Sequence, residues 1–90
     1  MDISFDPAKR DMTLTERGLD FADAPEVFAG LVFEQEDHRF DYGETRIITV
    51  GWLRGRMVVL VWTPRGETRH IISMRKANER EQARYKNRLG

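Results

Sequence analysis

Apolar and polar residues alternate with a period of two through much of the second half of the chain. Runs 46–53, 56–63 and 68–74 are rich in β-branched and aromatic residues, which favour extended strands. An Arg-Gly pair at 54–55 joins the first two runs, and the turn-like stretch 64–67 joins the second to the third. Because such short connections link neighbouring antiparallel strands, the pattern predicts a three-stranded meander.

The first half of the chain combines helical spacing with short extended segments. Residues 3–5 alternate as a short strand does. An Asp-Pro pair then predicts a helix over 7–17, which ends at Gly18 and carries so thin an apolar stripe that it should lie on the surface. A second helix is expected over about 25–30, because proline is tolerated at a helix start but not inside a helix. A further strand is expected to begin at Leu31.

The C-terminal segment has a clear helix-start signal. Asn78 with Glu81 three residues later resembles a capping box, so a helix is expected from there to about Leu89. The order of elements predicts an α+β fold, in which two N-terminal helices and one C-terminal helix pack on one face of a four-stranded antiparallel sheet. Residues 3–5 are a possible fifth, short strand at its edge. We expect residues 1–90 to form a single domain.

Composition narrows the chemistry open to this chain. It contains no cysteine, which excludes disulfides, thiolate zinc sites and cysteine nucleophiles. It has neither the start of a signal peptide nor an apolar run long enough to span a bilayer, so we expect a cytoplasmic protein with no membrane partner. Asp37, His38 and Asp41 cluster without a recognised zinc or calcium spacing, and there is no glycine-rich phosphate loop. We therefore expect no metal and no cofactor.

The formal net charge is zero, but the two halves of the chain have opposite charge. Residues 1–45 carry 12 acidic and 4 basic side chains, a balance of −8, and residues 46–90 carry 3 acidic and 11 basic ones, a balance of +8. A concentrated basic surface is typical of proteins that bind polyanions such as RNA. The alternative is that the two halves neutralise each other by packing together.

The run 68–76 has the most informative pattern of charges. Alternation places Arg69 and Arg75 on one face of this strand and His70 and Lys76 on the other. Arginines are costly to bury against a helix, so their face is expected to be open or to face a ligand. The competing interpretation is that they are ordinary exposed arginines that pair with the acidic half.

The chain carries few groups suited to the proton transfers of RNA cleavage. Without a metal, that reaction needs a base for the 2′-hydroxyl proton, an acid for the leaving oxygen, and cations for the phosphorane charge. His70 is one candidate, although alternation places it on the face opposite to the arginines. Glu44 and Glu67 are alternative bases, and Tyr85 can orient a phosphate or donate a proton. His38 lies in an acidic stretch, which favours a simply solvated side chain.

Two further groups of side chains are candidates for RNA contacts. Arg80, Arg84 and Arg88 recur at helical spacing near the C-terminus, where they form a basic ridge that either binds RNA or is a solvated helix face. Exposed aromatic rings can stack on bases. The candidate rings are those of Trp52, Trp62, Phe33 and Phe40, although aromatics in alternating strands more often belong to the core.

Four segments, in this order and spacing, resemble the BrnT toxin family over about residues 3 to 87. They are Phe5-Asp6-Pro7-Ala8-Lys9, Gly18-Leu19-Asp20-Phe21 leading into Val27-Phe28, Gly43-Glu44-Thr45-Arg46, and Arg69-His70-Ile71-Ile72-Ser73-Met74-Arg75-Lys76-Ala77 followed by Glu81 and Tyr85. The resemblance implies a RelE-like fold and a ribonuclease that halts translation by cutting RNA. It also implies a BrnA-like antitoxin with a ribbon-helix-helix part, through which alone the toxin would meet operator DNA.

The resemblance also implies which side chains form the site. Its motifs point to Glu44, Arg46, Arg69 and Arg75 with Lys76, and to Tyr85 behind them. Combined with the residue patterns, this predicts a metal-independent endoribonuclease in which three arginines bind the phosphate. The predicted catalytic residues are Glu44, Arg46, Arg69, His70 and Arg75, and the predicted RNA-binding residues are Lys76, Arg80, Arg84 and Tyr85.

One departure from the family pattern bears on activity. Members usually carry Asn-x-x-Lys-His-Gly at the end of the first helix, where this chain has Thr13-Leu14-Thr15-Glu16-Arg17-Gly18. If the missing histidine is catalytic, this chain is a weakened or inactive toxin that acts as an antitoxin-binding and co-repressor module. If the histidine only packs or caps the helix, little changes.

Overall fold

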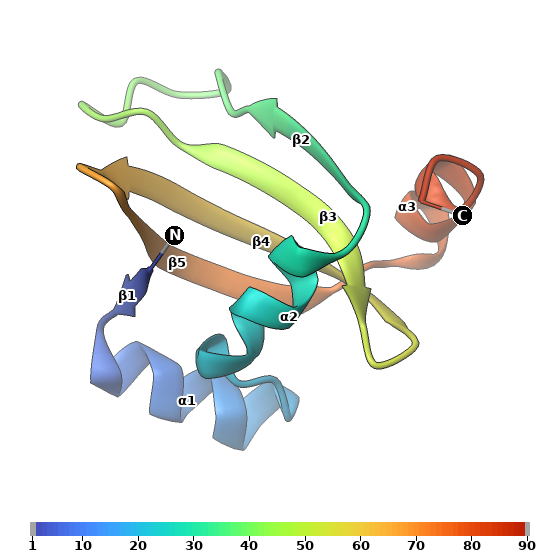
Figure 1. Cartoon of the computed structure of the whole chain (residues 1–90), viewed down its shortest axis with the longest axis horizontal. Coiled ribbons are helices and arrows are strands. Elements are labelled where there is room, and N and C mark those ends of the chain that lie inside the picture. Colours follow the sequence, from blue (N-terminus) through green and yellow to red (C-terminus); the bar gives the residue numbers. More distant parts are fainter. Residues whose placement is uncertain (1, 90) are drawn as a thin grey trace.

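The three apolar runs of the second half form the centre of one sheet in the computed structural model, which describes residues 2–89. Strands β3 (Ile47–Leu53), β4 (Arg56–Arg65) and β5 (Thr68–Lys76) pair antiparallel, as predicted, and β2 (Val32–Glu36) pairs antiparallel with β3. The short β1 (Ile3–Phe5) lies parallel to β5 at the opposite edge. The result is a mixed sheet in the order β1-β5-β4-β3-β2 (Figure 1). The α+β class is confirmed, but the sheet has five strands and is not purely antiparallel.

Two of the three α-helices within residues 2–89 begin at a side-chain cap. In front of α1 (Pro7–Arg17), the Asp6 carboxylate accepts a hydrogen bond from the Ala8 N–H, and Gly18 ends the helix in the left-handed region with a φ of 68°. No residue of α1 is buried, which agrees with its predicted surface position. A single 3-10 turn, η1 (Phe21–Asp23), leads into α2 (Ala24–Ala29), which begins one residue before the expected Pro25.

The C-terminal helix is shorter than the sequence pattern indicates. Asn78 and Glu81 form the predicted capping box at the start of α3 (Glu79–Tyr85), but the helix ends well before Leu89. Beyond Tyr85 the chain forms a tight turn, in which the N–H groups of Arg88 and Leu89 both donate to the Tyr85 carbonyl oxygen. This turn brings Leu89 into the core, where it is buried.

Helices cover both faces of the sheet, and the prediction that all three pack on one face is wrong (Figure 1). The reason lies in β4, which carries apolar side chains on both of its faces. Val58, Leu60 and Trp62 pack with α2 and η1 in one core cluster, and we call this side of the sheet the α2 face. Met57 and Val59 pack with Tyr85 and the C-terminal turn in a second cluster, on what we call the α3 face.

An irregularity in β5 changes which of its side chains share a face. Val61 of β4 pairs with Ser73, but the next residue, Trp62, pairs with Ile71, which leaves Ile72 without a partner on β4. Such a bulge shifts the alternation by one residue. Strict alternation assigns two side chains such as those of Arg69 and Arg75 to one face of β5. Because the extra residue, Ile72, lies between them, they lie on opposite faces.

The opposite charges of the two halves are not neutralised mainly by pairing between them. Among the ion pairs of residues 2–89, only those of Arg46 with Glu44 and of Arg54 with Asp23 and Glu26 join the acidic half to the basic half. No helix within residues 2–89 is long and apolar enough to cross a membrane.

Candidate functional site

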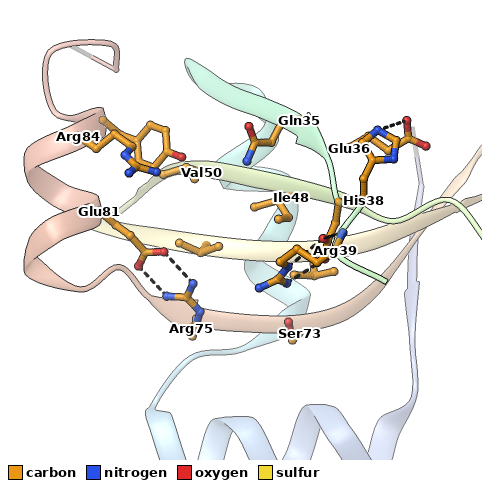
Figure 2. Close-up of a pocket in the computed structure, with 14 residues that line it drawn as sticks. Gln35, Glu36, His38, Arg39, Ile48, Val50, Ser73, Arg75, Glu81 and Arg84 are labelled. Carbon is orange, nitrogen blue, oxygen red and sulfur yellow. Dashed lines mark hydrogen bonds and ion pairs between the residues drawn. The ribbon is translucent and has the colours of Figure 1, made fainter. Parts of the chain in front are cut away.

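A groove of about 610 Å³ lies on the α3 face of the sheet. Its floor comes from the middle of β3, β4 and β5, where the α3 helix is too short to cover the sheet. One wall is α3, and the other is the segment that follows β2 (Figure 2). The groove is lined by Gln35, Glu36, Asp37, His38, Arg39, Ile48, Val50, Val59, Val61, Ser73, Arg75, Glu81, Arg84 and Tyr85.

Arg75 enters the groove from β5 and is fixed by a carboxylate of α3. Its two terminal nitrogens donate to the two oxygens of Glu81, at 2.7 and 2.8 Å (Figure 2). One of these oxygens also accepts from the Asn78 backbone N–H as part of the capping box. The hydrogen bonds from Arg75 lower the pKa of Glu81 to about 2, although burial opposes the shift. The start of α3 and the position of Arg75 are therefore coupled through one side chain.

Arg39 faces the same groove from the opposite wall. Its side-chain Nε and a terminal nitrogen donate to the two oxygens of Asp37, each at 2.9 Å. The Asp37 side chain is only 2 % exposed, and it also accepts from the Arg39 backbone N–H and the Tyr42 hydroxyl. These hydrogen bonds, those from Arg39 foremost, hold the pKa of Asp37 well below its usual range. The Arg39 side chain itself is 69 % exposed, so its charge is available to the groove.

The two arginines lie within electrostatic reach of each other. The hydrogen bonds to Glu81 raise the pKa of Arg75, and the charge of Arg39 acts in the opposite direction. Arg75 is 44 % exposed. Two guanidinium groups from separate elements thus face one solvent-open groove, each oriented by its own carboxylate.

The remaining groove residues come from α3 and the end of β2. Arg84 and Tyr85 line the groove, and their role in RNA binding stays a prediction. Tyr85 is mostly buried and packs its ring on Phe33, with 5.0 Å between centroids. His38 is 77 % exposed, in agreement with its predicted solvation, and its Nε2 lies 3.2 Å from a Glu36 oxygen.

Several predicted site residues lie elsewhere, and the prediction that Arg69 and Arg75 share a face is wrong. The bulge at Ile72 leaves Arg69 on the α2 face, where its guanidinium lies 4.0 Å from the centre of the Phe28 ring and 5.1 Å from that of Trp62. Its Nε is buried and has no hydrogen-bond partner within residues 2–89.

Arg46 is also separate from the two groove arginines. Its guanidinium lies 4.0 Å above the Tyr42 ring, and its Nε is 3.5 Å from a Glu44 oxygen. Arg46 and Glu44 line a second hollow beside the groove. Arg46, Arg69 and Arg75 therefore do not meet in one hollow. Lys76 and Arg80 are exposed and do not line the groove either.

His70 does not line the groove. Its Nδ1 lies 2.9 Å from the Ser4 hydroxyl oxygen of β1. Burial, followed by the positive charge of Arg65, lowers the pKa of His70, while the negative charge of Glu44 opposes the shift. The bulge places His70 on the α3 face with Arg75, so the prediction that these two lie on opposite faces is wrong. His70 is held in the contact with β1, and it lines neither the groove nor the second hollow.

Sequence reasoning missed the part played by Asp37 and Arg39. It treated the segment after residue 34 as a solvated acidic stretch, because a polar turn has no periodicity to read. The available signal was an aspartate two residues before an arginine and five before a tyrosine, which is a spacing that allows a side-chain network within one turn.

The family departure at the end of α1 lies outside the groove lining. A terminal nitrogen of Arg17 donates to the Met74 carbonyl oxygen of β5 at 3.0 Å. Within residues 2–89 no group of three or more histidine and acidic side chains is arranged to hold a metal ion.

Comparison with known proteins places the chain in a family. No curated protein matches it significantly. A family model described as the ribonuclease toxin BrnT of type II toxin-antitoxin systems matches residues 5–81. This match spans most of the chain, from the end of β1 through the helix turn that carries Glu81. The chain belongs to the BrnT family of ribonuclease toxins of type II toxin-antitoxin systems.

Proposed function

We propose that this chain is an active, metal-independent endoribonuclease toxin that cleaves RNA in the groove of the α3 face. The observation that carries the proposal is the pair of guanidinium groups of Arg39 and Arg75, which face one open groove from separate elements. Guanidinium groups bind phosphate through paired N–H donors. A family whose members cut RNA needs such a site for the scissile phosphate.

The fixed carboxylates make this pair suited to transition-state stabilisation. In metal-free cleavage the 2′-oxygen attacks phosphorus, the 5′-oxygen leaves, and the phosphorane between them gains negative charge. Asp37 and Glu81 hold the two cations in place before the substrate arrives, so little reorganisation is needed as that charge develops. Arg84 extends the positive charge along α3, where it can meet a neighbouring phosphate.

As the general base that takes the 2′-hydroxyl proton we propose His38 instead of the predicted His70, with a solvent water protonating the 5′-oxygen as it leaves. His38 lines the groove and is well exposed, so its imidazole is open to a substrate held there. His70 and Glu44 do not line the groove. We propose a structural part for Arg69, which is stacked on Phe28 and Trp62 on the α2 face.

The proposal is tested by incubating the purified protein with single-stranded RNA in the presence of a chelator. The wild type should cleave, and Arg75→Ala should cut at least about 100-fold more slowly, as expected when one transition-state donor is lost. Arg54→Ala is the matched control, because Arg54 pairs with Asp23 and Glu26 away from the groove. His38→Ala should lose more activity than His70→Ala.

Three results would contradict the proposal. An Arg75→Ala variant that is folded and as active as the wild type would remove the groove from the mechanism. Intact RNA with the wild type at high concentration would favour the inactive, antitoxin-binding module. Activity that appears only when a divalent metal is added would reject metal independence.

As its partner we propose a BrnA-like ribbon-helix-helix antitoxin, through which alone the toxin meets operator DNA in the cytoplasm. Type II toxins are neutralised by a protein, and the groove combines arginines with an apolar floor of Ile48, Val50 and Val59. That lining suits an acidic segment with apolar side chains. Expression of the chain should arrest growth, and co-expression of the neighbouring gene should restore it.

A further inference from the structure

An exposed aromatic ring stands beside the groove on a fixed support. Phe40 is 69 % exposed, and its ring meets that of Tyr42 edge-on, with 5.9 Å between centroids and 72° between planes. Tyr42 is held in turn by its hydroxyl, which donates to Asp37 at 3.0 Å, and by the Arg46 guanidinium over its ring. The network that places Arg39 in the groove therefore also places Phe40 next to it.

Phe40 lines a second hollow, which is continuous with the groove. This hollow has a volume of about 480 Å³ and shares Glu36, Asp37 and His38 with the groove lining. An RNA strand with one phosphate at Arg39 can therefore place a neighbouring base in the hollow without leaving the protein surface. An unpaired base stacks well on an exposed phenyl ring.

The hollow and the groove differ in charge. The hollow is net acidic, because the carboxylates of Glu36, Asp37, Asp41 and Glu44 line it beside one guanidinium, that of Arg46; this charge repels a phosphate. Glu36 and Glu44 also pair with His38 and Arg46, but each carboxylate has a second oxygen that can accept a hydrogen bond from an N–H group of a base. Guanine presents two such N–H groups side by side, whereas uracil presents one between two carbonyl oxygens. The hollow therefore suits a base, and guanine best.

We propose that this hollow is a nucleobase subsite, in which Phe40 stacks on an unpaired base next to the phosphate in the groove, with a preference for guanine. The inference rests on the proposed function, because it requires single-stranded RNA in the neighbouring groove. The inference goes beyond the proposed function because it names the part of the surface that selects which RNA sequence binds in the groove.

The test measures the affinity of a labelled single-stranded RNA by fluorescence anisotropy. Its riboses carry 2′-O-methyl groups, so that it cannot be cleaved. Phe40→Ala should weaken binding roughly tenfold, as loss of one stacked base does, and Phe40→Trp should stay within about twofold of the wild type because it keeps a stacking ring. The control is Leu31→Ala, which removes an apolar side chain that is 70 % exposed but lines neither hollow.

A second series tests the base preference with oligonucleotides that differ at one position. The guanine version should bind tightest to the wild type, and Asp41→Asn should reduce its advantage over uracil. This substitution retains a side-chain oxygen that can accept from the Gly43 N–H, as the Asp41 carboxylate does, so the loop keeps its shape.

The outcomes separate this inference from the function on which it rests. If Phe40→Ala binds as tightly as Leu31→Ala, the stacking role is wrong, while loss of cleavage in Arg75→Ala still supports the groove. If uracil binds as tightly as guanine, the base preference is wrong. If the wild type does not bind single-stranded RNA, both the subsite and the proposed function are overturned.

Discussion

Two of the groove arginines are each oriented by a carboxylate close to them in the chain. Arg39 is held by Asp37, two residues earlier, and Arg75 by Glu81, six residues later. Arg75 is predicted as a site residue, because it stands in a motif of the family that the chain resembles. Arg39 was not predicted, because its role depends on a turn that directs it toward the groove. A residue type can be recognised in a sequence, but the direction of its side chain in a loop cannot.

At the scale of single residues, the pair of Arg75 and Glu81 predicts a pH dependence of stability. Folding lowers the pKa of Glu81 from its ordinary 4.5 to about 2. The stabilisation is therefore present above about pH 4.5 and is lost as the pH falls toward 2. Hydrogen bonds between charged groups contribute about 1.5–3 kcal/mol, so Glu81→Gln should lower the free energy of unfolding by about that much at neutral pH.

The measurement is urea unfolding at a series of pH values. Glutamine preserves the capping box, since it is also found at this helix position, so the difference isolates the ionised pair. The gap between the wild type and Glu81→Gln should narrow steadily between pH 4.5 and 2. A gap that does not change with pH would show that the charge of Glu81 does not stabilise the fold.

At the scale of elements, the bulge in β5 decides which residues can act together. Without it, Ile71 and Met74 would lie on opposite faces, but both are buried in the cluster on the α2 face. The extra residue, Ile72, allows both to reach that core, and it separates Arg69 from Arg75. Strict alternation could not predict this, because the bulge is set by packing against two cores and leaves no pattern in the strand.

The end of α1 provides a prediction about the departure from the family pattern. Arg17 hydrogen-bonds the Met74 carbonyl on β5 and does not line the groove. Changing Glu16→Lys together with Arg17→His, which restores the family residues, should therefore leave the rate of RNA cleavage unchanged. The loss of the hydrogen bond should reduce the free energy of unfolding by about 1 kcal/mol.

Cleavage assays and urea unfolding of the same variants check this prediction. Glu16→Lys alone is the control, because Glu16 is exposed and leaves the hydrogen bond of Arg17 to β5 in place. A clear rise in the cleavage rate of the double variant would show instead that the family histidine takes part in the reaction. The interpretation of this chain as a weakened toxin would then be favoured.

At the scale of the whole molecule, the zero net charge does not describe how cations and carboxylates are distributed over the surface. Within residues 2–89, Arg46 and Arg54 are the only cations of the basic half that form ion pairs with carboxylates of the acidic half. The other cations of the basic half that the structure describes form no ion pair with the acidic half. The groove lining sets Arg39, Arg75 and Arg84 beside the carboxylates of Glu36, Asp37 and Glu81, over an apolar floor. Under the proposed function, attraction to RNA comes from how these charges are arranged on one face and not from net charge.

This arrangement predicts how salt affects RNA binding. Affinity for a single-stranded RNA should fall as salt is raised, because bound phosphates release counterions. Arg84→Ala should make the slope of log affinity against log salt shallower by about 0.7, the value for one phosphate contact on a single strand. Arg54→Ala should leave the slope unchanged. Equal slopes for the two variants would show that the groove is not where the phosphates bind.

The amino-acid sequence alone determined the order of the strands and α-helices, although not the length of the last helix, and the caps of the first and last helices. Those features depend on local signals, namely the period of apolar residues, Asp6-Pro7, and the pairing of Asn78 with Glu81, which act over a few residues. The tertiary structure alone decided that helices cover both faces, that β5 bulges at Ile72, and that Arg39 joins Arg75 in one groove. These outcomes depend on packing between segments far apart in the chain, where the need to bury two apolar faces overrides the local alternation of side chains.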